Sequence, residues 1–234
     1  MRPVLDIETP DGPMELRVFP PQGTPRGGVI FYMDAFGLRP ELDDLCAAHA
    51  REGWLALLPD LYHRLPRRHF RVPRDHDDPL DPAMHAANDA TSMAMTRMDT
   101  EAVLAAAAAF GVSRFGAVGH CMGARHALAA ATHFPAEVRA AACLHGGRMV
   151  SDGPDSPHLL IPRCPGGLYI AMARDDLTCP EPHQAMLESL ARPGVTVERV
   201  NALHGWTFPE RWCHDPAAAA RSFAATRALF ASRV

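Results

Sequence analysis

Short apolar runs alternate with amphipathic, alanine-rich stretches along most of the chain. Residues 29–33 and 54–58 are continuous apolar runs, a pattern typical of strands that are buried on both faces of a parallel sheet. Between them, Pro40 and a cluster of acidic residues begin a segment that Gly53 ends, which predicts a helix. Repetition of this alternation predicts an α/β fold, with a mostly parallel central sheet and helices on both faces.

The remaining elements follow from the same patterns. Two alternating stretches around a turn at 10–13 predict an antiparallel pair at the edge of the sheet. Residues 146–167 are rich in proline and glycine and predict the longest loop. Because no internal repeat occurs, we expect residues 1–234 to form one domain. The predicted strands are 4–9, 14–19, 114–118, 138–144, 168–171 and 195–200, and the predicted helices are 81–110, 122–133, 181–191 and one from Pro216.

Composition narrows the class of protein and of partner. Hydrophobic residues make up 47% of the 234 residues and charged residues 21%, which is ordinary for a globular protein. The formal net charge is -4 and the arginines are scattered, so we expect no nucleic-acid partner. The longest apolar run, 102–112, is too short to cross a bilayer, and the first residues lack the apolar stretch of a signal peptide. We therefore expect a cytoplasmic protein that does not enter a membrane.

The charged segment, the cysteines and the histidines indicate no further reactive or metal-binding site. Basic residues gather at 63–74 and acidic residues follow at 75–81, which predicts a solvent-exposed loop that balances its own charges, with a substrate-binding lid as the alternative. The six cysteines are widely spaced without a Cys-x-x-Cys pair, and the histidines show no repeated ligand spacing. We therefore expect reduced thiols, no metal and no cofactor, while the oligomeric state stays open.

The segment from Gly119 to Gly123, Gly-His-Cys-Met-Gly, lies between a predicted strand and a predicted helix. A nucleophile elbow holds its central residue in a strained backbone conformation, and small residues two positions before and after it let the strand and the helix pass closely. Cys121 is therefore the candidate nucleophile, and the helix N-terminus beyond it favours the reactive thiolate. The alternative is an ordinary buried cysteine at a glycine-rich turn.

A carboxylate and a histidine follow in the chain order of α/β-hydrolases, which is nucleophile, acid, histidine. Asp175 and Asp176 come after a predicted strand, and His204 follows the strand 195–200. Spacing alone leaves either aspartate as the candidate acid.

The candidate oxyanion hole is formed by two backbone amides. Ala35 follows the strand 29–33, where this fold places the second donor, and Met122 follows the nucleophile. Acyl transfer needs such donors aimed at the developing negative charge. The side chain of Asp34 is either a turn cap or a modulator of Cys121, since a nearby carboxylate perturbs the protonation of a thiol.

Taken together, these residues resemble the dienelactone hydrolase (carboxymethylenebutenolidase) family of the α/β-hydrolase superfamily over nearly the whole chain. Residues 33–39, Met-Asp-Ala-Phe-Gly-Leu-Arg, are similar to the family's segment after the third strand. Residues 59–64, Pro-Asp-Leu-Tyr-His-Arg, are similar to its Pro-Asp-Leu-Tyr-x-Arg motif. The resemblance implies the triad Cys121, His204 and Asp176, because the family's acid lies four residues before a proline, here Pro180.

Two positions depart from the family pattern. Four residues after the triad histidine, dienelactone hydrolase has an arginine that helps hold the substrate carboxylate, and this chain has Phe208; Asp34 replaces the usual glutamate. A buried carboxylate without a cationic partner costs several kcal/mol, so the resemblance implies a substrate other than dienelactone unless another arginine substitutes. The candidate substrate-binding residues are Arg39, Arg97, Arg125, Trp206 and Phe208.

The sequence thus favours a hydrolase that acts on a small-molecule lactone or carboxylic ester. A class I glutamine amidotransferase also uses a cysteine elbow, but it predicts His-x-Glu where this chain has His204-Gly205-Trp206. The non-enzyme alternative is a catalytically silent binding protein of the same fold, whose pocket Trp206 and Phe208 fill.

Overall fold

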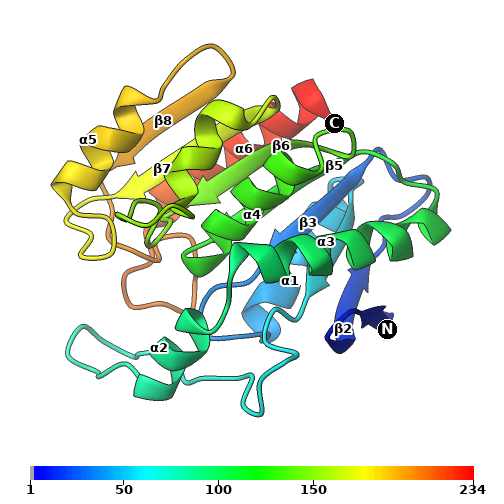
Figure 1. Ribbon diagram of the computed structural model, residues 1–234, viewed down its shortest axis with the longest axis horizontal. Coiled ribbons are helices and arrows are strands. Elements are labelled where there is room, and N and C mark those ends of the chain that lie inside the picture. The colour runs from blue at the N-terminus through cyan, green and yellow to red at the C-terminus, as the bar shows by residue number, and fades with distance from the viewer. Residues whose placement is uncertain (1–2) are drawn as a thin grey trace.

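A computed structural model describes residues 3–234 and shows an eight-stranded sheet in the order β1-β2-β4-β3-β5-β6-β7-β8 (Figure 1). Strands β3 to β8 run parallel, and β1 and β2 pair antiparallel at one edge, as the sequence predicts. The strands are β1 (Val4–Thr9), β2 (Gly12–Phe19), β3 (Gly28–Tyr32), β4 (Leu55–Pro59), β5 (Phe115–His120), β6 (Val138–Leu144), β7 (Gly167–Ala173) and β8 (Val195–Val200).

The interior strands explain why the apolar runs are continuous. Every residue of β3, β4, β5 and β7 is buried, because helices cover both faces of the sheet. The carboxyl ends of the parallel strands lie along one edge of the sheet, where open α/β folds bind their ligands. The predicted α/β-hydrolase fold with a mostly parallel sheet is confirmed.

Helices form the two outer layers. Helices α3 and α4 contact each other and cross in front of the sheet in Figure 1, whereas α6 lies behind it. Near its end, α6 meets the end of α1 through an ion pair between Arg227 and Glu52. The helices are α1 (Pro40–Arg51), α2 (Pro82–Asp89), α3 (Met93–Ala107), α4 (Met122–His133), α5 (Glu181–Ser189) and α6 (Pro216–Arg233), with short 3-10 helices η1 (Ala108–Phe110) and η2 (Pro157–Arg163).

The predicted helical region 81–110 is helical but divided, because it folds as α2, α3 and η1. Ser92 adopts an extended backbone, and its side chain accepts a hydrogen bond from the Met95 N–H, which starts a new helix. One residue earlier, the Thr91 hydroxyl donates to the Ala87 carbonyl and closes the end of α2. The predicted loop 146–167 likewise contains a short element, η2.

The charged segment 63–81 balances its own charges in part. Arg67 pairs with Asp81 at 2.6 Å and Arg71 pairs with Asp78, both pairs within the segment. Arg64 instead leaves the segment and forms a bidentate pair with Asp99 on α3. These pairs fix the path of the segment toward α2. Among the helices of residues 3–234, none combines the length and the apolar character needed to cross a bilayer.

Candidate active site

Cys121 occupies a strained turn between β5 and α4. Its backbone has φ 54° and ψ -114°, in the left-handed half of conformational space that residues with a side chain rarely adopt. The two glycines around it are required by close approach: a Cβ on Gly119 would lie 2.0 Å from the Gly123 carbonyl oxygen, and a Cβ on Gly123 would lie 2.2 Å from the Tyr32 carbonyl oxygen. The turn has the geometry of a nucleophile elbow.

The structure brings His204 to Asp176 rather than to Asp175. The Nδ1 atom of His204 lies 2.7 Å from Oδ2 of Asp176, whose side chain is 2% exposed. The other oxygen of Asp176 accepts hydrogen bonds from the Thr178 N–H and hydroxyl, at 2.8 Å and 2.7 Å. The side chain of Asp175 is 78% exposed and pairs with Arg174. Of the two aspartates that spacing left open, Asp176 is the one that contacts His204.

The charges of Cys121 and His204 favour each other. Burial raises the pKa of the Cys121 thiol, but the charge of His204 and a hydrogen bond from it lower that pKa further, so the net shift is downward. Burial lowers the pKa of His204, but the Cys121 thiolate and the Asp176 carboxylate raise it to about 10. Both shifts favour the form of the pair in which the thiolate of Cys121 faces the imidazolium of His204.

Ala35 and Met122, the two oxyanion-hole candidates, line one cavity with Cys121 and His204. Met122 is the first residue of α4, so its N–H has no acceptor within the helix. The carbonyl of Ala35 accepts a hydrogen bond from the Tyr62 hydroxyl at 3.1 Å, which fixes the turn after β3. Both candidate residues therefore border the cavity that Cys121 lines.

Asp34 is both a turn cap and a neighbour of the nucleophile. Its carboxylate is fully buried, accepts the Phe36 N–H at 3.1 Å and raises the pKa of Cys121 through its charge. Arg39 holds this carboxylate in a bidentate ion pair, with distances of 2.6 Å and 2.8 Å, and also pairs with Glu210. Arg39 is therefore engaged within the protein and is not available to bind a substrate.

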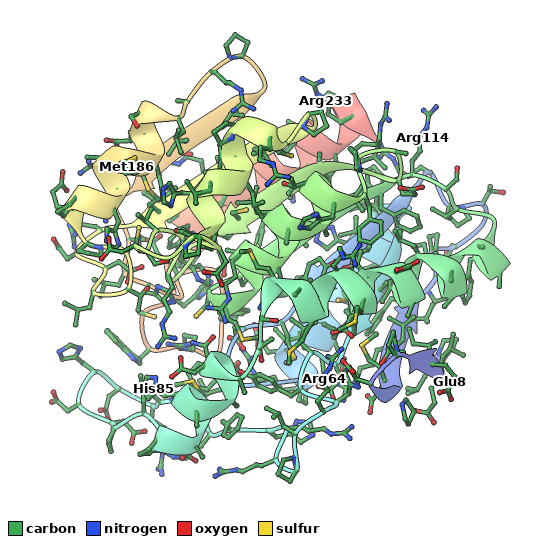
Figure 2. The ribbon with its side chains drawn as sticks, in the orientation of Figure 1. Glu8, Arg64, His85, Arg114, Met186 and Arg233 are labelled. Atoms are coloured by element: carbon green, nitrogen blue, oxygen red, sulfur yellow. The ribbon has the colours of Figure 1, made fainter. Side chains whose placement is uncertain are left out.

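The cavity above Cys121 is small and has a volume of about 150 Å³. Helix α2 and the residues before it form one wall, and His85 projects from this helix (Figure 2). The segment 63–81 thus also contributes to the site, because its end, Leu80, lines the cavity. The other lining residues outside the triad and the oxyanion hole are Phe36, Met84, Asn88, Arg125, Gly147, Arg148, Thr178 and Arg211.

Of the arginines proposed from sequence, only Arg125 lies at the cavity. It is nearly buried and donates to the side-chain and backbone oxygens of Asn88, which are neutral acceptors. Arg97 is exposed on α3 and is absent from the lining. Sequence reasoning missed Arg211, which lines the cavity with its guanidinium 4.9 Å from the centre of the Phe36 ring. The only signal for it was its place seven residues after His204.

Trp206 and Phe208 lie in the core and not on the cavity wall. Both side chains are fully buried, and Phe208 packs beneath Arg39, whose guanidinium lies 5.0 Å from the ring centre. They therefore cannot serve as substrate contacts in this arrangement, because the turn that carries His204 directs them inward. A silent binding protein was expected to have its pocket filled by these two side chains, and they do not fill the cavity.

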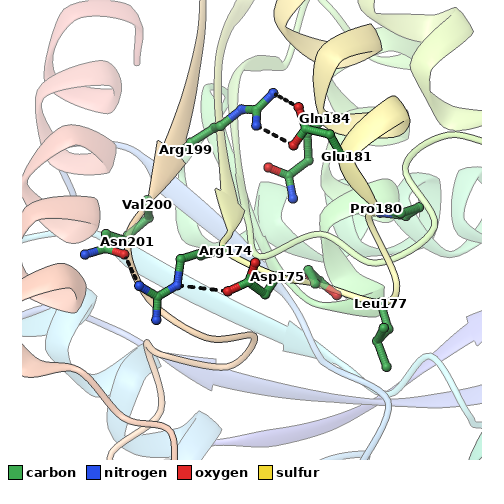
Figure 3. Close-up of a pocket in the computed structure, with 10 residues that line it drawn as sticks. Arg174, Asp175, Leu177, Pro180, Glu181, Gln184, Arg199, Val200 and Asn201 are labelled. Atoms are coloured by element: carbon green, nitrogen blue, oxygen red, sulfur yellow. Dashed lines mark hydrogen bonds and ion pairs between the residues drawn. The ribbon is translucent and has the colours of Figure 1, made fainter.

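A larger hollow of about 570 Å³ lies on the other side of the acid loop (Figure 3). Most of its charged groups are paired with one another, Arg199 with Glu181 and Arg174 with Asp175. Neither Cys121 nor His204 lines it, whereas both line the smaller cavity. Within residues 3–234, no group of three histidine, cysteine or carboxylate side chains is arranged to hold a metal ion, and none of the six cysteines forms a disulfide bond.

Comparison with known proteins agrees with this geometry. A model of the dienelactone hydrolase family matches residues 14–234. An Azospirillum brasilense protein assigned as a carboxymethylenebutenolidase is 40% identical over 65 residues, 26% of this chain and only 28% of that relative's length. A Klebsiella pneumoniae structure assigned as a dienelactone hydrolase has a TM-score of 0.83 at 22% identity, covering 99% of this chain and 98% of its own. The dienelactone hydrolase of Anabaena variabilis has a TM-score of 0.69 at 17% identity, covering 100% and 98%. At these identities the solved structures show the shared fold, and with the family match across most of its length the chain belongs to the dienelactone hydrolase family.

Proposed function

We propose that this protein hydrolyses a small carboxylic ester or lactone through Cys121, His204 and Asp176. The observation that carries the proposal is the strained elbow at Cys121 beside a histidine that is bound to a buried carboxylate. An ordinary structural cysteine needs neither a left-handed backbone nor a charged partner, whereas a nucleophile needs both exposure at the turn and a low pKa. The family match supports hydrolysis as the reaction class.

The first half of the reaction acylates the cysteine. The Cys121 thiolate attacks the carbonyl carbon, and the negative charge on the carbonyl oxygen is stabilised by the Ala35 and Met122 amides. The bond to the leaving oxygen then breaks as His204 gives its Nε2 proton to that oxygen. The products of this half are a thioester on Cys121 and a free alcohol, which in a lactone remains attached to the acyl chain.

The second half releases the acid. Neutral His204 removes a proton from a water molecule, and the hydroxide attacks the thioester carbonyl at the same oxyanion hole. The carbon–sulfur bond breaks, and the Cys121 thiolate and the His204 imidazolium are restored. Asp176 keeps the Nδ1 proton of His204 in place through both halves, because its carboxylate accepts that proton's hydrogen bond.

The cavity favours an acyl group that carries a negative charge. Arg125 binds only neutral oxygens, and the Nε of Arg211 has no hydrogen-bond partner among residues 3–234. Two cations facing a cavity of about 150 Å³ offer the partner that a buried carboxylate needs. Phe208 stands where the family has its carboxylate-binding arginine, and we infer that Arg211 takes over this task from another position in the same loop.

A pair of esters tests this substrate class. Mono-p-nitrophenyl succinate carries a carboxylate, and p-nitrophenyl butyrate has an acyl chain of equal length without one. We expect Arg211→Gln to lower kcat/KM for the succinate ester about 10- to 100-fold, the range of one charge-assisted hydrogen bond, and to leave the butyrate ester within about twofold. Arg97→Gln is the matched control, since Arg97 is exposed away from the cavity. An equal loss on both esters would contradict the assignment of Arg211, and full turnover by Cys121→Ala would contradict the nucleophile.

We propose that the reaction takes place in the cytoplasm, because six widely spaced cysteines with no Cys-x-x-Cys pair suit a reducing compartment. Cell fractionation followed by detection of the protein would test this location.

A further inference from the structure

Two buried histidines share one hydroxyl group beside His204. The Oγ1 atom of Thr207 lies 2.9 Å from Nδ1 of His120 and 2.7 Å from Nε2 of His145. All three side chains are fully buried. His120 immediately precedes the nucleophile, His145 follows the end of β6, and Thr207 lies three residues after His204. One hydroxyl therefore joins the nucleophile strand to the turn that carries the histidine.

The ring of His145 fills the inside of this turn. Its centre lies 5.0 Å from the ring of His204, at an interplanar angle of 62°, and 4.9 Å from the ring of Trp206, at 74°. Its own backbone is fixed, because the His145 N–H donates to the Ala171 carbonyl at 2.8 Å. Covalent chain, hydrogen bond and ring contact thus form a closed path from His204 through Thr207 and His145 back to His204.

Both shared histidines are held neutral. Burial lowers the pKa of His120 to about 3, and burial followed by the charge of His204 lowers the pKa of His145 well below its usual value. A hydroxyl has one proton, so Thr207 can donate to one ring and accept from the other, which restricts the two rings to complementary neutral tautomers. A neutral ring can contact the His204 imidazolium without repelling it.

We propose that Thr207 and His145 are positioning residues that hold the His204 ring in the orientation in which it pairs with the Cys121 thiolate. The inference rests on the proposed function of that pair. Neither residue lines the cavity, so neither contacts the substrate. The other titratable or charged groups that act on His204 are Cys121 and Asp176, and those that act on His145 are His204, His120 and Arg211.

The test measures the thiolate without using a substrate. Alkylation of Cys121 by iodoacetamide is followed from pH 5 to 10 and quantified on the peptide that contains Cys121. Thr207→Val removes the hydroxyl and keeps the shape of the side chain. We expect it to raise the pH at which Cys121 becomes reactive by about one unit, a tenfold lower thiolate population below that pH. Thr207→Ser retains the hydroxyl and should keep the profile of the unmodified protein.

Two further variants separate positioning from stability. Thr226→Val removes another buried hydroxyl, which donates to the Ser222 carbonyl in α6 away from the site, and should leave the profile unchanged. His145→Asn removes the ring and suits the left-handed backbone there, φ 38°, so it should shift the profile as Thr207→Val does and serves if the valine variant does not fold.

The outcomes distinguish this inference from the proposed function. Three results would overturn the positioning role alone. The first is an unshifted profile in Thr207→Val or His145→Asn. The others are an equal shift in Thr226→Val and a shifted profile in Thr207→Ser. A Cys121 in the unmodified protein that reacts only near pH 8.5, the ordinary range of a thiol, overturns the proposed nucleophile and this inference with it.

Discussion

The carboxylate of Asp176 accepts the Nδ1–H of His204 at 2.7 Å, while two further donors from Thr178 hold its other oxygen. A buried carboxylate with this set of donors stays ionised, and the pKa of Asp176 is lowered: burial raises it, but the hydrogen bonds and charge of His204 lower it more. Asp176 is therefore charged across the neutral pH range and holds the Nδ1 proton of His204.

Replacing this acid should abolish most of the activity. We expect Asp176→Asn to lower kcat about 10³- to 10⁴-fold, because a neutral amide neither stabilises the imidazolium nor fixes its tautomer. Steady-state hydrolysis of a p-nitrophenyl ester measures the loss. Asp175→Asn is the matched control, since that side chain is exposed and pairs with Arg174. An equal loss in the two variants would contradict the assignment of Asp176 as the acid.

The glycine before the nucleophile should not tolerate a side chain. The added Cβ of Gly119→Ala would lie 2.0 Å from a backbone oxygen that cannot move aside. Overpacking of this kind costs about 1–3 kcal/mol, and we expect a loss of at least this size in the free energy of unfolding. Urea denaturation followed by tryptophan fluorescence measures it. Gly153→Ala is the comparison, because its Cβ would meet only the flexible end of Asp155. Equal stability of the two variants would contradict the close approach at the elbow.

Arg39 should be needed for stability because it neutralises Asp34. Removing one partner of a buried ion pair leaves an uncompensated charge and costs about 3–5 kcal/mol. We expect Arg39→Met to lose about this amount and the double variant Arg39→Met with Asp34→Asn to recover much of it, as measured by urea denaturation. Arg199→Met breaks an exposed pair with Glu181 and Glu188 and should cost less than about 1 kcal/mol. A double variant no more stable than Arg39→Met would exclude the charge of Asp34 as the cause.

Acid should destabilise the fold well above the pH at which carboxylates titrate. Burial lowers the pKa of His120 to about 3 and those of His126 and His145 well below the ordinary value of 6.5. Below pH 6.5 these three histidines therefore bind more protons in the unfolded chain than in the folded one, so the stability that they contribute is complete above this pH and falls as the pH decreases.

The slope is at most about 1.4 kcal/mol per pH unit for each such histidine. Urea denaturation at pH 7 and pH 5 measures this slope. His126→Gln should reduce the pH dependence of the free energy of unfolding by about the contribution of one histidine. A free energy of unfolding that stays constant from pH 7 to pH 5 would mean that these histidines can take up protons in the folded state.

The sequence predicted the fold because its signals are local. Continuous apolar runs mark β3 and β4, and glycines mark the elbow at Cys121, so periodicity and spacing were sufficient. The break between α2 and α3 was missed because the alanines and methionines around Thr91 and Ser92 favour a helix, and the N-cap signal of Ser92 was not used.

The composition of the cavity depends on contacts between distant segments, which spacing does not reveal. Arg39 looked available for substrate, but it pairs with Asp34 and Glu210, and Glu210 lies 171 residues away in the chain. Arg211 looked unremarkable, yet its loop returns it to the cavity. Trp206 and Phe208 were proposed as substrate contacts by proximity to His204, but the turn points them into the core.

The central claim is that Cys121 forms a covalent acyl intermediate, and mass spectrometry of the acid-quenched protein tests it most directly. After brief mixing with mono-p-nitrophenyl succinate, we expect a succinyl adduct on the peptide that contains Cys121, which disappears as the substrate is consumed. The adduct should be absent from Cys121→Ala, which should also lack the rapid burst of p-nitrophenol. A variant without Cys121 that hydrolyses the ester at the original rate, or an adduct on a different residue, would contradict the account.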